Sequence, residues 1–370
     1  MLAGVGLVYL VSILATRRMA GLDIGELHPI TSLATATISF ALLSLLLLFS
    51  RTYYSRTFML VAFLVVVTWL ILGRWLKKRL FRPRLAVEPD AVRPEVFYSS
   101  DADWHTLLGP SLPVMRFDGL VADQDSADPD WQRFHTQCEL GGLPVYHGPL
   151  VSEQITGRVS LERLSSGHMS DMRPRPVYAL FKRGFDVATV VVTAPLTGPL
   201  ILLIALAIRA DSPGPVFFTQ QRIGQGGRLF RMVKFRSMRA DVASAKAQFA
   251  GQGDDRITRV GQVIRRLRID ELPQFWNVLK GEMSIIGPRP EQVDFAKRFE
   301  SSIPFYGYRH LVKPGISGWA QVMQGYADSE AGTRDKLEYD LYYAKHCSFW
   351  LDMLIGIRTF RILLTGEGAR

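Results

Sequence analysis

The feature that most constrains this sequence is an uncharged stretch in the middle of the chain, from Val187 to Ile208. Its 22 residues are enough for a helix that crosses the hydrocarbon core of a bilayer, which takes about 17 to 25 residues. The centre of the stretch contains Pro195, Gly198 and Pro199. Because proline lacks the backbone N–H donor of a helix and clashes with the preceding turn, this composition predicts a break within the membrane segment.

Basic residues lie on both sides of this stretch, with Lys182 and Arg183 before it and Arg209 after it. Lys and Arg are retained on the cytoplasmic side of a membrane, so both ends are expected on that side. We therefore predict a re-entrant helix over about residues 182–210, which enters the bilayer and returns. A kinked helix that spans the bilayer is the alternative that the sequence leaves open.

Three further uncharged apolar runs open the chain: Leu2–Thr16, Pro29–Ser50 and Thr57–Gly73. The last two reach the length of a spanning helix, and a basic cluster from Arg74 to Arg84 follows them. The positive-inside rule assigns that cluster to the cytoplasm. Residues 1–82 are thus predicted to form a transmembrane helical bundle. The first run is interpreted as a membrane helix, because the basic region that begins a signal peptide does not precede it.

Residues 83–173 have the composition of a soluble domain. Leu120–Ala122 and Val145–Tyr146 are short apolar runs typical of buried strands, and Trp131–Glu139 between them is a plausible helix. These segments predict a small α/β domain. It has no glycine-rich phosphate loop, which favours a structural spacer, although a ligand-binding role stays open.

The 44 Lys and Arg residues outnumber the 34 Asp and Glu residues, which gives a net charge of +10. This charge suits a surface that meets anionic lipids, phosphorylated substrates or nucleic acid. The two cysteines, Cys138 and Cys347, are far apart in the sequence. They form neither a disulfide framework nor a metal-binding motif, which is typical of a reducing cytosolic environment.

Two segments after the central stretch have clear local patterns. Phe217–Ile223 and Leu229–Ser237 flank a glycine cluster and predict a β-hairpin. Phe349–Leu364 carries apolar residues at helical spacing, interrupted by charged residues. Such a helix fits the plane of a membrane interface and equally fits packing on a protein core.

Adjacent carboxylates, Asp270 and Glu271, precede Pro273, which suits the first turn of a helix that Gly281 would end. The pair is therefore expected near a helix N-terminus. Amide dipoles there stabilise negative charge. We predict that they keep Asp270 ionised, as a nucleophilic or metal-binding carboxylate requires.

Arginines gather around this pair in the sequence. They are Arg259, Arg265, Arg266, Arg268 and Arg289. Guanidinium groups bind phosphate oxygens through paired hydrogen bonds, and Arg289 is stiffened by a proline on each side. A carboxylate that attacks a phosphoryl group needs cations to neutralise the phosphate oxygens. The pattern thus predicts a site for phosphorylated substrates, with Mg²⁺ as the expected ion because oxygen ligands are on offer.

Five motifs in this order resemble those of the bacterial sugar transferases, the monotopic phosphoglycosyl transferases. The motifs are Phe217–Gly224, Val233–Met238, Ile269–Gln274, Gly287–Pro290 and Lys313–Val322. The resemblance covers Tyr178–Leu364, and the N-terminal half looks like that of the long members, the undecaprenyl-phosphate galactose or glucose phosphotransferases. It implies a membrane protein of α/β class in three parts. These are transmembrane helices over 1–82, a Rossmann-like α/β domain over 83–173 and a catalytic domain over 174–370 that contains the re-entrant helix.

The resemblance also implies a reaction: transfer of a sugar-1-phosphate from a UDP-sugar to undecaprenyl phosphate, with release of UMP. Asp270 matches the family nucleophile, placed near Mg²⁺, and Glu271 matches its partner in the dyad. Other matched positions have supporting roles. Arg265 and Arg289 match phosphate-binding positions, Lys234 and Arg236 are candidates for substrate contact, and Pro199 with Gly198 matches the membrane break. The enzyme is expected on the cytoplasmic face of the bacterial inner membrane, at the first membrane step of exopolysaccharide, capsule or O-antigen synthesis.

Three alternatives differ from this ping-pong enzyme. A transferase could act in a single step without a covalent intermediate, and a membrane scaffold could recruit glycan-assembly enzymes. A nucleic-acid binder is disfavoured, because the arginines cluster with carboxylates and membrane helices and lack aromatic stacking platforms. No nucleic-acid partner is therefore expected, whereas a homo-oligomer is compatible with the sequence.

Overall fold

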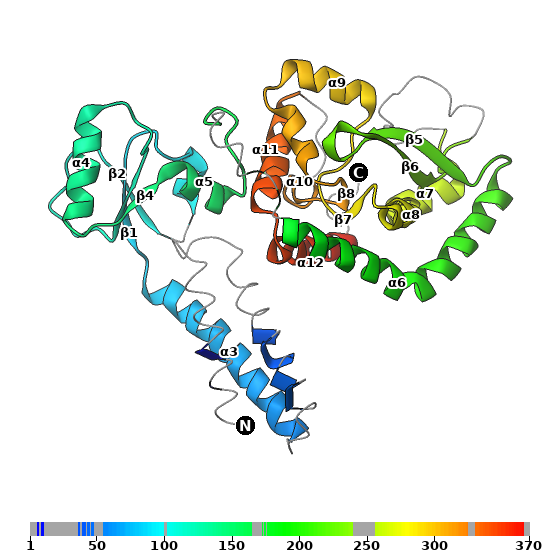
Figure 1. Ribbon diagram of the computed structural model, residues 1–370, viewed down its shortest axis with the longest axis horizontal. Coiled ribbons are helices and arrows are strands. Elements are labelled where there is room, and N and C mark those ends of the chain that lie inside the picture. The colour runs from blue at the N-terminus through cyan, green and yellow to red at the C-terminus, as the bar shows by residue number, and fades with distance from the viewer. Residues whose placement is uncertain are drawn as a thin grey trace. The chain divides into compact units, whose positions relative to one another are not determined.

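A computed structural model gives the structure of the protein. It describes residues 6, 9, 10, 36, 37, 39–41, 43, 44, 46, 47, 55–99, 102–164, 172, 174, 176–239, 256–324 and 330–365. The chain divides into two compact units, Met1–Arg163 and Leu164–Arg370, and each has its own helices and strands (Figure 1).

Helix α3 (Arg56–Leu80) in the first unit contains the predicted run Thr57–Gly73 and continues into the basic cluster. Ser55 caps its N-terminus, since the hydroxyl accepts a hydrogen bond from the amide of Phe58. By length and composition Arg56–Lys77 could cross a membrane, and only 12% of its most apolar window is buried. The other two predicted runs lie largely outside the described residues.

A parallel four-stranded sheet follows in the first unit. Its strands are β1 (Arg84–Val87), β2 (Asp103–Thr106), β3 (Gly119–Ala122) and β4 (Val145–His147), in the order β2-β1-β3-β4. The connections include η1 (Pro94–Tyr98) and helix α4 (Pro129–Leu140), and helix α5 (Gly148–Thr156) follows β4. Alternate residues of the central strands enter two separate hydrophobic clusters, as expected for a sheet covered on both faces.

Strands β3 and β4 and helix α4 confirm the three elements predicted for the middle of the chain. Strands β1 and β2 and helix α5 were not predicted.

The second unit combines helices with two small sheets. Its elements after helix α6 (Pro176–Asp211) are β5 (Phe217–Ile223), η3 (Gln225–Gly227), β6 (Leu229–Phe235), α7 (Arg259–Arg266), η4 (Ile269–Glu271), α8 (Gln274–Lys280), β7 (Ser284–Ile286), α9 (Val293–Ser302), η5 (Tyr306–Leu311), β8 (Gly315–Ser317), α10 (Trp319–Met323), α11 (Glu330–His346) and α12 (Phe349–Thr365). The antiparallel pair β5 and β6 confirms the predicted hairpin. Strands β7 and β8 are parallel.

The central apolar stretch forms one helix, α6, with Pro195 and Pro199 inside it. Figure 1 shows that α6 is strongly bent. Thr193 and Thr197 donate side-chain hydrogen bonds to carbonyls one turn earlier, a contact that adds to the bending caused by proline. The predicted helix–break–helix is therefore corrected, because the prolines bend a single helix without ending it.

Both halves of α6 pack on the same unit. Val190 of the first half lies in a buried cluster with Met232 of β6 and Val278 of α8. Ile204 and Ile208 of the second half lie in a cluster with residues of β6 and α7. The helix therefore leaves the unit, bends and comes back to it.

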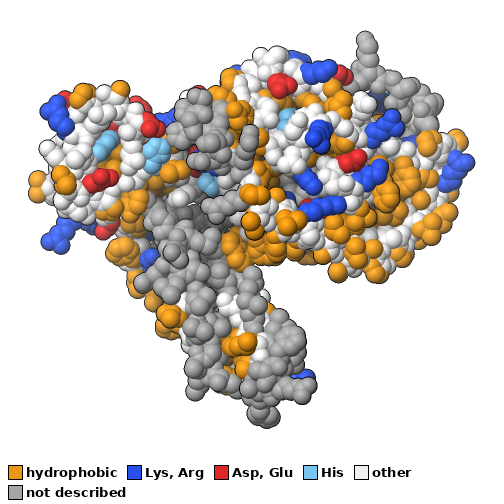
Figure 2. Space-filling view, in the orientation of Figure 1, with side chains coloured by type: hydrophobic (Ala, Val, Ile, Leu, Met, Phe, Trp, Pro, Cys, Tyr) orange, Lys and Arg blue, Asp and Glu red, His pale blue; other side chains and the backbone are white. Residues whose placement is uncertain are grey.

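Little of α6 is otherwise covered, since only 11% of its most apolar window is buried. Val192, Leu196 and Leu203 are among its exposed apolar side chains. Figure 2 shows hydrophobic side chains gathered along the side of the second unit where α6 lies. A soluble core helix is mostly buried, so α6 does not resemble one.

Close glycine packing joins β7 and β8. A Cβ atom on Gly315 would lie 2.1 Å from the amide nitrogen of Gly287, and one on Gly318 would lie 2.3 Å from the Gly287 carbonyl oxygen. Real Cβ contacts are never this short, so glycine is required where these backbones meet. The contact fixes the start of the turn that carries Arg289.

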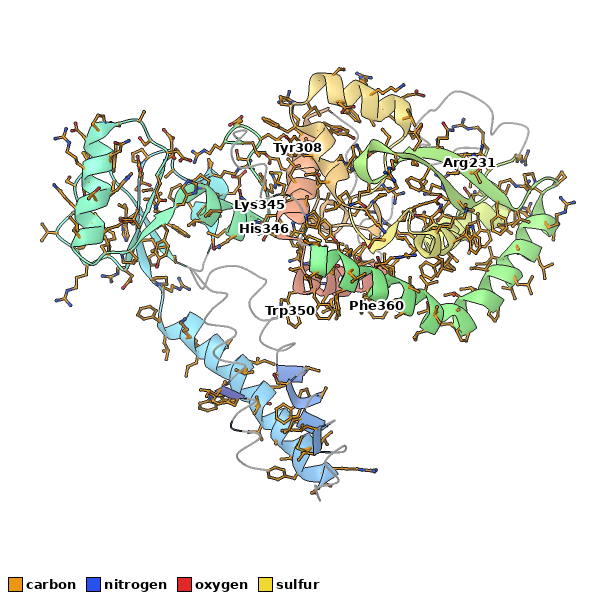
Figure 3. The ribbon with its side chains drawn as sticks, viewed as in Figure 1. Arg231, Tyr308, Lys345, His346, Trp350 and Phe360 are labelled. Atoms are coloured by element: carbon orange, nitrogen blue, oxygen red, sulfur yellow. The ribbon has the colours of Figure 1, made fainter. Side chains whose placement is uncertain are left out.

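Helix α12 agrees with both interpretations of its sequence pattern. Leu351 and Ile355 are fully buried, which confirms packing on a core, whereas Phe360 and Leu363 are exposed. Figure 3 shows Phe360 and Trp350 projecting from α12 away from the strands of the unit. The exposed apolar side keeps an interfacial position open.

Candidate active site

Asp270 and Glu271 lie in η4, directly before helix α8. The preceding residue, Arg268, has a left-handed backbone with φ of 54°, which turns the chain after α7. Such a φ is uncommon for a residue other than glycine and marks a constrained turn. Helix α8 ends at Gly281 with φ of 84°, so the predicted glycine stop is confirmed.

Glu271 is the centre of a buried ion-pair cluster. Its Oε1 accepts hydrogen bonds from Nζ of Lys234 at 2.7 Å and from Nη2 of Arg289 at 2.8 Å. The Glu271 side chain is only 12% exposed, so solvent screens these pairs weakly. Strand β6, η4 and the turn after β7 thus meet at one carboxylate, although they are distant in sequence.

The two adjacent carboxyl groups have different pKa values. Burial alone would raise the pKa of Glu271, but the charges of Arg289 and Lys234 hold it well below its usual range. Burial raises the pKa of Asp270; Lys234 opposes this shift, and the charge of Glu271 adds to it. Amide dipoles were predicted to keep Asp270 ionised, and burial acts on its pKa in the opposite direction. A shifted pKa of this kind is typical of a reactive group.

Arg265 contributes a free donor to the same site. Its Nη1 is buried, and no hydrogen-bond acceptor reaches it in the described part of the chain. The charge of Arg265 lowers the pKa of Asp270, so the two groups are near neighbours. A buried donor without an acceptor is costly, and a phosphate oxygen would satisfy it.

Three other predicted residues lie elsewhere. The Arg236 guanidinium, 4% exposed, donates to the carbonyls of Ser212 and Pro213 in the loop after α6. It stabilises that loop and is not brought into the Glu271 cluster. Gly198 and Pro199 lie within α6, with open space beside Gly198.

A second, deeper charge cluster was not predicted. Arg309 of η5 is 3% exposed and pairs with Asp340 of α11 at 2.7 Å. Glu291 pairs with Lys336, also on α11. The sequence did contain a signal for this cluster. Asp340 lies among apolar and aromatic residues, and an acid buried in such surroundings needs a cation as its partner.

Replacing Glu291 with Gln is expected to reduce the pH dependence of stability in acid. Burial alone would raise the pKa of Glu291, but Lys336 and Arg309 lower it from 4.5 to about 2. A lowered carboxyl pKa gives stability that is present above pH 4.5 and is lost as the pH falls toward about 2. The loss corresponds to about 3 kcal/mol.

Unfolding temperatures of wild type and Glu291→Gln, measured from about pH 7 down to about pH 3, check this expectation. The difference between the two proteins should be largest at neutral pH and shrink in acid. A difference that stays constant with pH would contradict it.

A separate acidic cluster lies in the first unit. Metal-binding atoms of Asp123, Asp125 and His147, at the carboxyl ends of β3 and β4, lie within 4.8 Å of one another. Asp125 is exposed and already contacts His147 at 3.4 Å. Exposed acidic groups often gather without a metal, so we assign no metal to them.

The second unit therefore combines a carboxylate of raised pKa, buried cations and an unsatisfied arginine donor beside an exposed apolar helix. This combination is what an enzyme that handles phosphorylated substrates at a membrane requires. The particular family follows from comparison with known proteins.

Residues 177–366 match the family described as bacterial sugar transferase. A relative from Aeromonas hydrophila, UDP-N-acetylgalactosamine-undecaprenyl-phosphate N-acetylgalactosaminephosphotransferase, is 49% identical over 298 residues, which are 80% of this chain and 70% of the relative. UDP-glucose:undecaprenyl-phosphate glucose-1-phosphate transferase from Caulobacter vibrioides is 40% identical over 198 residues, 53% of this chain and 74% of the relative. The exopolysaccharide production protein PSS from Rhizobium leguminosarum is 40% identical over 197 residues, 51% of this chain and 98% of the relative.

The chain belongs to the bacterial sugar transferase family, as a long-form member. It is an enzyme, so the scaffold alternative does not describe its main role.

Proposed function

We propose that this protein transfers a sugar-1-phosphate from a UDP-sugar to undecaprenyl phosphate and releases UMP. The observation that carries the proposal is the cluster at Glu271, where Lys234 and Arg289 meet beside Asp270. The names of two relatives supply the classes of donor and acceptor. The cluster supplies the carboxylate and the cations that such a reaction requires.

Asp270 is the nucleophile in the proposed mechanism. One of its oxygens bonds to the β-phosphorus of the UDP-sugar, and the bond from that phosphorus to the bridging oxygen breaks. UMP leaves with the electron pair, and the phosphosugar remains bonded to the Asp270 carboxylate as an acyl phosphate. An oxygen of undecaprenyl phosphate then attacks the same phosphorus and displaces the Asp270 carboxylate. Burial removes water from this carboxylate, which makes it a better nucleophile once ionised.

The cations have distinct roles in this proposal. Arg289 and Lys234 share the charge of Glu271, so together they carry one net positive charge toward the diphosphate. The free Nη1 of Arg265 would donate to a phosphate oxygen. Because these groups are fixed before substrate arrives, they stabilise the negative charge that develops in the transition state with little reorganisation.

The donor set also fits Mg²⁺. Asp270 offers hard oxygen ligands and accepts no hydrogen bond from the residues that the structure describes, whereas both Glu271 oxygens accept from Arg289. Mg²⁺ commonly binds through one carboxylate together with substrate phosphates and water. We propose Asp270 as its protein ligand, where the bound ion would neutralise diphosphate oxygens.

We further propose that α6 is re-entrant and that the second unit lies on the cytoplasmic face of the bacterial inner membrane. Two observations support this: both halves of α6 pack on one unit, and its remaining surface is apolar and exposed. Exposed Phe360 and Leu363 of α12 would lie at the same interface. The lipid acceptor could then reach Asp270 from the membrane and the nucleotide sugar from the cytosol.

N-acetylgalactosamine-1-phosphate is the transferred group that we propose first. The Aeromonas relative named for this sugar matches 80% of the chain at 49% identity, whereas the Caulobacter relative named for glucose matches 53% at 40%. For residues 83–173 we propose a Rossmann-like domain. Its strands are parallel in the order β2-β1-β3-β4, so the chain adds strands first on one side of β1 and then on the other, as in doubly wound folds. The product would enter exopolysaccharide, capsule or O-antigen synthesis.

The test is a donor screen with the purified full-length chain in lipid nanodiscs, with undecaprenyl phosphate and Mg²⁺ present. UMP release and labelled lipid are measured for UDP-N-acetylgalactosamine, UDP-glucose and UDP-galactose. We expect turnover to be at least about tenfold faster with the first donor than with the others. Failure of every UDP-sugar to release UMP would refute the proposed function, and a faster reaction with another donor would refute only the choice of sugar.

A further inference from the structure

We propose that Arg309 is a positioning residue that fixes the turn Gly287–Glu291, so that Arg289 is held on Glu271. Its effect on turnover rests on the proposed function. Its effect on the turn itself does not, and the two are measured separately.

Each residue of this turn has a backbone group bonded to another segment. The Gly287 amide donates to the Ser317 carbonyl, and the carbonyls of Pro288, Arg289, Pro290 and Glu291 accept from the Gly315 amide, the Arg309 guanidinium, the Arg222 guanidinium and the Ile223 amide. Two of these five donors are side chains, so they can be removed without altering the backbone. Of these five donors, Arg309 is the one bonded to Arg289, whose own side chain reaches Glu271.

The contacts of Arg309 are those of a structural clamp. Its Nη2 donates to the Arg289 carbonyl at 2.9 Å and to Oδ2 of Asp340 at 2.7 Å, and its Nη1 donates to the Tyr306 hydroxyl at 2.7 Å. The side chain is 3% exposed, and its Nη1 also lies 3.7 Å from Oε1 of Glu291, the last residue of the turn. Among the described residues proposed to bind substrate, Arg309 bonds to the Arg289 carbonyl. One guanidinium thereby links helix α11 to the turn.

Lysine cannot reproduce this geometry. Its single nitrogen has no planar fork, so it can keep the charge pair with Asp340 but not the Tyr306 and Arg289 bonds at the same time. The Arg309→Lys variant thus separates charge from geometry. Retaining the charge avoids leaving the buried Asp340 without a cation, which would strongly destabilise the fold.

The first measurement is hydrogen–deuterium exchange of the peptide that contains residues 287–292, in the full chain without substrate. We expect Arg309→Lys to increase exchange of this peptide by about tenfold in rate, as for a turn that opens locally. Arg298→Lys, on the exposed side of α9, is the matched control and should leave exchange unchanged. Unaltered exchange in Arg309→Lys would overturn the proposal, even if the protein showed no transferase activity.

The second measurement is a double-mutant cycle on UMP release. We expect Arg309→Lys to lower kcat about tenfold with a smaller change in KM, because a displaced arginine weakens mainly the transition state. If Arg309 acts through Arg289, the same change in an Arg289→Ala background should cost less than about twofold. Equal losses in both backgrounds would show a general structural effect and would overturn the proposal.

Discussion

Replacing Asp270 with Asn is expected to reduce UMP release by at least about a thousandfold, a loss typical of removing a covalent nucleophile. The amide of Asn has nearly the same volume but cannot attack phosphorus. Because the described residues donate no hydrogen bond to the Asp270 carboxylate, the fold should tolerate the change. The variant should therefore keep its unfolding temperature within about 2 °C of wild type while losing activity.

Mass spectrometry of the enzyme with donor but no acceptor sharpens this prediction. The wild type should carry a phosphosugar on the peptide that contains Asp270, and Asp270→Asn should carry none. Asp294→Asn, an exposed position on α9, is the matched control. Turnover by wild type without any covalent species would favour the single-step alternative, and normal UMP release by Asp270→Asn would rule out this nucleophile.

Replacing Glu271 with Gln should have the second largest effect, because it removes the charge that holds Lys234 and Arg289 together. Two partly buried cations would then lose the carboxylate to which both donate. Breaking a buried ion pair from one side costs about 3 to 5 kcal/mol of stability. Misplacement of the two cations should also lower kcat/KM by about a hundredfold.

Chemical denaturation and steady-state kinetics of Glu271→Gln test both parts. Glu300→Gln, at an exposed position of the same unit, controls for the loss of a surface carboxylate and should behave as wild type. The explanation fails if Glu271→Gln matches wild type in stability. A double variant, Glu271→Gln with Lys234→Met, removes one of the two repelling charges and should recover part of the lost stability. The explanation also fails if this double variant is no more stable than Glu271→Gln alone.

Local signals in the sequence predicted a good part of the fold. The β5–β6 hairpin, helix α8 with its glycine stop and the strands β3 and β4 each depend on residues close together in the chain. Turn chemistry and apolar spacing are sufficient for such elements. The domain boundaries at residues 82 and 173 remain predictions; the structure divides into units between Arg163 and Leu164.

The sequence predicted candidate residues for the site but not the contacts that each of them makes. Lys234 and Arg236 are two residues apart, so a continuing strand would direct both to one face. Strand β6 ends at Phe235, and Arg236 instead bonds the loop after α6. The different contacts of Lys234 and Arg236 arise from the position where strand β6 ends, and no local sequence pattern marks that position.

The sequence by itself determined that this chain carries apolar membrane-type helices, an acidic pair before a helix and enough arginine to bind phosphate, because each is a matter of composition or short-range spacing. Tertiary structure decided which partner each charge has. Glu271 meets Lys234 and Arg289 because β6, η4 and the turn after β7 converge, and the pKa of Asp270 is raised mainly because that side chain is largely buried. Burial and long-range contact depend on the whole chain, so the short-range spacing of residues cannot reveal the environment of these carboxylates.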